Sequence, residues 1–135
     1  MSVVSFPVAV SNRAACRAFV KDLPRHVADQ TRRQVDGSSY AAAWGDPAIV
    51  LRCGSLVLPG KPRSDPCLTR NGIGWTVPPA QIDDMGSRID MTLSHRGLRV
   101  TVRVPATYRP NGPSEVMADL DAVVRAHTEA HGHCS

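Results

Sequence analysis

The sequence predicts an α+β fold in which two helices pack on one face of a mostly antiparallel sheet of about four to five strands. Two observations carry this prediction. Apolar residues recur at helical spacing near both ends of the chain, and they alternate with polar residues in between. With 135 residues, of which 42% are hydrophobic, the chain is long enough to bury one modest core.

The first predicted helix follows Ser11, a residue type that caps helices, and Pro24 ends it. Its buried face consists of Cys16, Phe19, Val20 and Leu23. The second predicted helix follows Ser114 and carries Glu115 in its first turn, where the helix dipole favours a negative charge. Its buried face consists of Val116, Leu120, Val123 and Val124, and Gly132 ends it.

Strands are predicted between these helices, with residues 40–44 as a possible further short strand. Residues 48–53 form the first strong strand, and its side chains alternate between two faces. The turn Asn71-Gly72 favours a hairpin between residues 68–70 and 73–77. A second hairpin follows, so strands fill the chain between the two helices.

That last hairpin joins residues 89–93 to residues 98–104, and apolar side chains occupy every second position of both. A period of two predicts one buried and one solvated face. The solvated face carries three arginines, Arg88, Arg99 and Arg103, with Asp90 as a neutralising neighbour.

The chain is predicted to divide into three parts. Residues 1–10 form an extended linker after a missing membrane anchor, residues 11–130 a single α+β domain, and residues 131–135 a polar tail. No apolar run approaches the ~20 residues that span a bilayer. We therefore expect membrane association only through an anchor that is absent from this chain.

The net charge of +4 comes mainly from arginine, with 14 arginines against 2 lysines. A basic balance favours anionic partners. The arginines are spread along the sequence, and no RNA-binding aromatic motif, helix-turn-helix or zinc-finger spacing accompanies them. Nucleic acid is thus not an expected partner.

The segment Trp44–Gly54, WGDPAIVLRCG, resembles the signature of the actinobacterial domain of unknown function 3515 family. The resemblance extends over roughly residues 14–125 and includes Cys16-Arg17-Ala18, Leu23-Pro24, Asn71–Trp75, and Leu98–Val104 followed by Pro105. It implies a small extracytoplasmic protein, secreted or anchored on the outer face of the cytoplasmic membrane. The family has no established activity, so the resemblance implies no catalytic residue.

The four cysteines allow three pairings, and the absence of a CxxC pair argues against a four-cysteine zinc site. The resemblance implies a disulfide between Cys16 and Cys53, because family members keep cysteines at both positions and some lack the equivalent of Cys67. A Cys67–Cys134 pair follows only by elimination, and Cys134 can instead stay free.

Four residues are candidates for binding a partner: Trp44, Asp46, Arg52 and Trp75. Each also has a structural interpretation, which we favour. The tryptophans suit a core or an edge, and an aspartate before proline usually bonds the backbone of a turn. If the two tryptophans converge in space, a binding groove is favoured instead.

The C-terminal run offers His127, His131 and His133 as ligands for zinc, nickel or copper. His127 and His131 are four residues apart and would share a helix face. We favour a polar tail with no metal site, because tails are usually mobile. No cofactor is expected, since neither GxGxxG nor GxxxxGK[ST] occurs.

Two functions remain. The favoured one is a non-enzymatic extracytoplasmic domain that binds a protein or another envelope component, which a contiguous apolar or arginine-lined patch would support. The alternative is a small hydrolase or ligand-binding enzyme, which requires a deep pocket near Trp44, Asp46 and Arg52. The sequence contains no GxSxG elbow, and we predict no catalytic residue.

Overall fold

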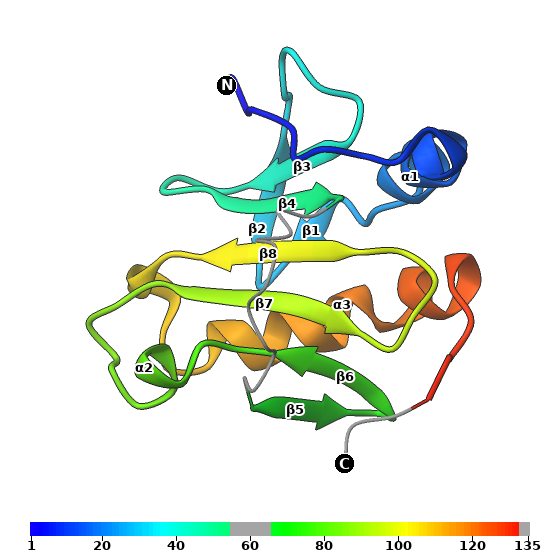
Figure 1. Cartoon of the computed structure of the whole chain (residues 1–135). Helices are drawn as coiled ribbons and strands as arrows, with labels where there is room; N and C mark the ends of the chain where they lie inside the picture. Colours follow the sequence, from blue (N-terminus) through cyan, green and yellow to red (C-terminus); the bar gives the residue numbers. More distant parts are fainter. Residues whose placement is uncertain (55–65, 133–135) are drawn as a thin grey trace.

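The computed structural model describes residues 1–54 and 66–132 (Figure 1). Its helices are α1 (Arg13–Lys21), α2 (Pro79–Ile82) and α3 (Gly112–His127), with 3-10 turns η1 (Val10–Asn12) and η2 (Ala106–Tyr108). Its strands are β1 (His26–Val27), β2 (Gln30–Arg33), β3 (Ala41–Trp44), β4 (Ile49–Cys53), β5 (Cys67–Arg70), β6 (Ile73–Thr76), β7 (Ile89–Ser94) and β8 (Val100–Val104).

The strands form one antiparallel sheet in the order β1-β2-β3-β4-β8-β7-β6-β5. Two four-stranded meanders, β1–β4 and β5–β8, therefore meet along the β4–β8 pair. The predicted α+β class is confirmed, but the prediction of four to five strands was too low. The short strands β1 and β2 were missed because β2 is polar, with the sequence QTRR, and buries none of its residues fully.

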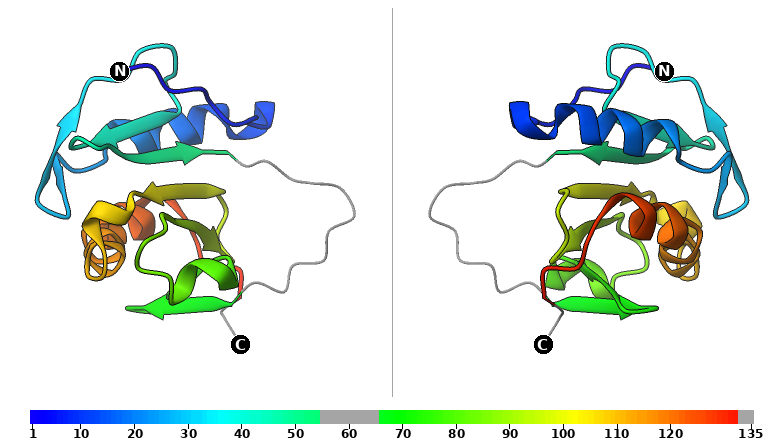
Figure 2. Two further views of the ribbon diagram at one scale, coloured as in Figure 1. Left: turned by 90° about the vertical axis from the view of Figure 1, so that its left-hand side faces the viewer. Right: turned by 90° about the vertical axis from the view of Figure 1, so that its right-hand side faces the viewer.

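Helix α3 lies along one face of this sheet and contacts both of its outermost strands, β1 and β5. A straight helix can touch both edges only if the sheet curves around it, and the side views show this curvature (Figure 2). Side-chain hydrogen bonds fix both ends of the arrangement. Asp119 accepts from the Ala28 backbone N–H at 2.8 Å, and Arg70 Nη1 donates to Ser114 Oγ at 2.6 Å.

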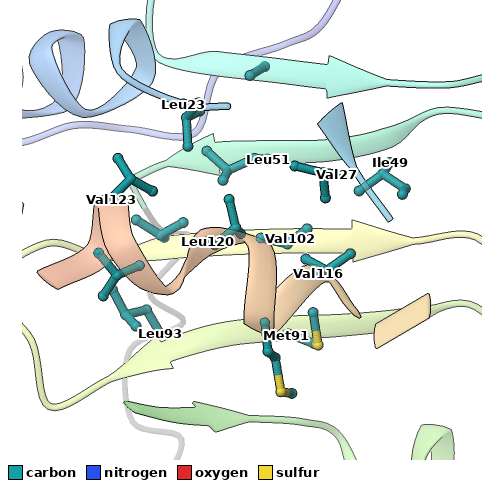
Figure 3. Packing of buried hydrophobic residues seen from close by; sticks show 14 of the residues in the cluster. Leu23, Val27, Ile49, Leu51, Met91, Leu93, Val102, Val116, Leu120 and Val123 are labelled. Carbon is teal, nitrogen blue, oxygen red and sulfur yellow. The ribbon is translucent and has the colours of Figure 1, made fainter. Parts of the chain in front are cut away.

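The core fills the space between α3, α1 and the covered face of the sheet. The buried side chains of α3 point toward those of the central strands (Figure 3). The labelled contacts are Val116, Leu120 and Val123 on the helix and Leu51, Met91, Leu93 and Val102 on the strands. In β7 and β8 every second residue is buried, which confirms the predicted period of two.

Helix boundaries differ from the predicted ones. Helix α1 begins at Arg13, after η1, and α3 begins at Gly112 with Pro113 in its first turn, so neither Ser11 nor Ser114 is the N-cap. Pro at this position is favourable because the first-turn N–H groups have no helical partner. Helix α3 ends at His127 rather than near Gly132, because Thr128 is extended and its Oγ1 donates to the Val124 carbonyl at 2.6 Å.

Residues 1–10, expected to be an extended linker, lie against the first meander. Ser2 bridges Asp36 in parallel fashion, and the terminal ammonium donates to the Gln34 carbonyl at 3.0 Å. Val3 is 6% exposed. The start of the described chain is thus part of the folded body.

Candidate functional site

Both tryptophans are core residues. Trp44 on β3 and Trp75 on β6 are 0% and 1% exposed, and strands β4, β8 and β7 separate them in the sheet order. Trp44 Nε1 donates to the Pro24 carbonyl at 2.9 Å. The rings do not converge, and neither presents a face at the surface, so the condition under which they would form a binding groove is not met.

Asp46 lies in the β3–β4 turn, and its side chain is 91% exposed. The turn is built by its neighbours. Gly45 has a φ of +78°, and a Cβ there would come within 2.7 Å of Gln30 and 2.8 Å of Tyr108. The Tyr108 hydroxyl donates to the Pro47 carbonyl at 2.5 Å. Asp46 itself has one long ion pair, 3.9 Å from Arg33 Nη1.

Arg52 fastens the N-terminal segment to the sheet. Its Nε donates to the Val4 carbonyl at 2.9 Å, and its guanidinium lies 5.0 Å from the centre of the Phe6 ring. Burial lowers the pKa of Arg52 and the charge of Arg103 lowers it further, whereas Asp90 raises it. Arg52, which was predicted to bind a partner, therefore contacts its own chain through its Nε hydrogen bond and through the Phe6 ring.

Four cavities lined by described residues bear on the pocket that the enzyme hypothesis requires. Those cavities, of about 280–310 Å³ each, have linings that contain neither Trp44, Asp46 nor Arg52. A hydrolase site at these three residues stays a prediction.

The structure contains the Cys16–Cys53 disulfide, with an S–S distance of 2.03 Å. It joins the buried face of α1 to the end of β4, and both cysteines are at most 1% exposed. The second predicted pairing lies outside the described residues, because Cys134 is not among them.

The histidine candidates for a metal site do not share a helix face. Helix α3 ends at His127, whose Nε2 lies 2.7 Å from Asp22 Oδ2, while His131 follows the helix and bonds the His95 carbonyl through its backbone. His133 lies outside the described residues. Within residues 1–54 and 66–132, no cluster of three or more His, Cys, Asp or Glu residues is arranged to hold a metal ion.

The face of the sheet opposite α3 gathers arginines at the seam of the two meanders. The register pairs Arg103 with Val50 and with Asp90, and it pairs Arg52 with Thr101. Directly paired residues of an antiparallel sheet project from the same face. Arg99 follows the same alternation one step before Thr101. The predicted solvated face of β7 and β8 therefore exists, and the β4–β8 pairing adds Arg52 to it.

Asp90 neutralises part of this charge, as predicted. Its carboxylate oxygens lie 2.8 Å from Arg103 Nε and 3.2 Å from Arg88 Nε, and Gln81 Nε2 donates to it at 3.0 Å. Burial raises the pKa of Asp90, but the hydrogen bonds and the charge of Arg103 outweigh burial and leave the pKa below its ordinary value. Asp90 is thus a carboxylate that organises the arginines rather than a proton donor.

We call Arg52, Arg88, Arg99 and Arg103 the arginine face. Arg88, Arg99 and Arg103 are exposed, and Arg52 is half-buried. Asp90 is the one carboxylate paired with them among the described residues, so the face carries a net positive charge. Sequence reasoning found three of the four arginines by alternation. Arg52 was predicted as a binding residue but not as a neighbour of these arginines, and Gln81 was missed, because only strand order and the path after β6 bring the two alongside.

Comparisons with known proteins place this chain in a family. No helix within the described ranges has the length and apolar character needed to cross a bilayer. Neither the curated proteins nor the solved structures contain a match to the chain. The family model for proteins of unknown function DUF3515 matches residues 1–132, which include both meanders, α1 and α3. The chain therefore belongs to the DUF3515 family.

Proposed function

We propose that the protein is a non-enzymatic, extracytoplasmic domain of the cell envelope that binds an anionic envelope component through its arginine face. The observation that carries the proposal is the excess of guanidinium groups over carboxylates on that face, four against one. Guanidinium groups suit carboxylates and phosphates because their planar N–H donors can bond two oxygens at once.

The disulfide supports the proposed location. Disulfides persist in oxidising compartments and are rare in a reducing cytosol. The Cys16–Cys53 bond is buried between α1 and β4, so it is part of the core and not a surface contact. Anchoring at the membrane, which the family resemblance implies, belongs to the same proposal.

The direct test measures binding of two anionic polymers, poly-L-glutamate and polyphosphate, by calorimetry at low and at physiological salt. We expect the variant Arg99→Ala/Arg103→Ala to bind at least one of them several-fold more weakly than the wild type. Binding should also weaken as salt screens the charges. The matched control is Arg13→Ala/Arg25→Ala, which removes the same charge from exposed positions outside the arginine face.

Equal losses in the two double variants would show that only net charge matters and would contradict a specific face. Tighter binding of a single-stranded oligonucleotide than of either polymer would also contradict the proposal. Envelope extracts passed over the wild type and both double variants would then identify the partner as the component that only Arg99→Ala/Arg103→Ala fails to retain.

A further inference from the structure

A separate groove opens at the far end of the second meander, between β5 and the first turns of α3. It encloses about 310 Å³. Its apolar lining includes Leu68, Ile82, Met85, Ile89 and Met117. Leu68 and Met85 are 37% and 45% exposed, and they are two of the four exposed large hydrophobic side chains in the described part of the chain. Two of these four side chains therefore line the groove, where an apolar ligand could cover them.

Arg70 spans the groove from β5 to α3. Its Nη1 donates to Ser114 Oγ at 2.6 Å, and both residues line the cavity. Arg70 is exposed and makes no ion pair with any described carboxylate. Its remaining N–H donors can therefore bond an anion at the mouth of the groove.

Arg109 forms part of the opposite wall. Its terminal nitrogens donate to the carbonyls of Gln81, Ile82, Asp84 and Ser87 at 2.6–3.2 Å, which fixes the segment that carries Met85. Its charge, like that of Arg70, is not paired with a carboxylate in the described chain. Its Nε is buried and has no acceptor among the described residues.

We propose that this groove binds a small amphiphile, a linear apolar chain that ends in a carboxylate or phosphate. The apolar lining takes the chain, and Arg70 at the mouth takes the anionic head, while the nearby charge of Arg109, which no described carboxylate balances, favours an anion there. The volume lies at the lower end of the ~300–1,000 Å³ typical of small-molecule sites, which suits a single short chain. This site is separate from the arginine face, which lies on the side of the sheet opposite α3.

The methionines provide a built-in test, because the chain has four and two of them line the groove. We would label the methionine ε-methyl groups with ¹³C and titrate the protein with decanoate, decyl phosphate and 1-decanol below micelle-forming concentrations. Met85 and Met117 should shift saturably, whereas Met1 at the terminus and Met91, which is 0% exposed, should not. Shifts of all four signals together, or of none, would overturn the proposal.

The variants separate the head group from the chain. Arg70→Ala should weaken binding of the anionic probe about tenfold, as expected for loss of one charge-assisted hydrogen bond, and Arg70→Lys should retain part of the affinity. The matched control is Arg25→Ala, an exposed arginine beside β1 at the other end of the sheet, which should bind like the wild type.

If decanoate or decyl phosphate binds more tightly than 1-decanol, the result supports the site, and the tighter of the two anions identifies the head group. Equal binding by 1-decanol, or an unchanged affinity in Arg70→Ala with the Met91 signal intact, overturns it. Loss of the arginine face leaves this titration unaffected, so failure of either proposal can be told from failure of the other.

Discussion

In the first meander a disulfide ties helix α1 to the sheet, whereas in the second meander side-chain hydrogen bonds tie helix α3 to the strands. In the first, the Cys16–Cys53 bridge fixes α1 to β4, and Arg52 fastens the N-terminal segment. In the second, side chains link α3 to the strands. Arg70 donates to Ser114, and Arg125 Nη2 donates to the Asn71 carbonyl.

This difference matters for where a ligand can enter. A helix tied covalently to its strand leaves little freedom to admit a ligand beneath it. The contact between α3 and β5 is closed by polar side chains at its rim and opens into the apolar groove. The first meander therefore holds its helix through a covalent bond, and the second holds α3 through polar contacts at the rim of the groove.

The largest expected effect is loss of the bridge. In Cys16→Ala/Cys53→Ala, the free energy of unfolding should fall by about 4 kcal/mol, the chain-entropy value for cysteines 37 positions apart. Urea unfolding followed by circular dichroism measures it. Because either single substitution already removes the bond, the singles should lose nearly as much as the double. Additive losses would show that side-chain packing, rather than the bridge, closes the first meander.

The tryptophans test whether the two meanders unfold together. Trp44→Phe removes the donor to the Pro24 carbonyl and should cost roughly 1 kcal/mol more than Trp75→Phe. Each variant keeps one tryptophan, so its fluorescence reports on one meander alone. Since one hydrophobic cluster includes both rings, fluorescence and circular dichroism should give the same urea midpoint in each variant. Separate midpoints would divide the core into two units.

Asp90 should make stability at the seam of the meanders depend on pH. Its pKa is lowered in the folded state, so its contribution is present above the unfolded-state pKa, near ~4, and is lost as pH falls through the folded-state pKa. The wild type should exceed Asp90→Asn by about 1 kcal/mol in free energy of unfolding at pH 7. Urea titrations at several pH values should show that difference shrinking below about pH 4. A difference that persists at low pH would assign the effect to packing.

Sequence patterns predicted those elements in which the order of apolar and polar residues matches the order of buried and exposed positions. Strands β7 and β8 were found because Ile89, Met91 and Leu93 alternate with polar residues and this alternation coincides with the buried face. The arginines of the solvated face followed from the same period. The Cys16–Cys53 pairing came from family resemblance, because four cysteines allow three pairings and spacing alone does not choose.

The missed features depend on contacts between distant residues. Strand β2 is polar in sequence, and pairing with β3 makes it a strand. Arg52 joins the arginine face only because β4 pairs with β8, about 50 residues later. The groove could not be predicted, since β5, the segment after α2 and the start of α3 are separated in sequence and meet only in the folded chain.

The smallest expected effect concerns Asp46, a carboxylate of the first meander that is exposed, whereas Asp90 in the second meander is partly buried. Its side chain is 91% exposed and 3.9 Å from Arg33, so Asp46→Asn should change the free energy of unfolding by about 0.5 kcal/mol or less. Gly45→Ala is the positive control, because its φ of +78° and the contacts with Gln30 and Tyr108 make any Cβ costly. Urea unfolding of both variants compares adjacent positions of one turn. A large loss of stability in Asp46→Asn would show that this carboxylate helps to form the turn. Its exposure indicates instead that Gly45 and the hydrogen bond from Tyr108 to the Pro47 carbonyl hold the turn.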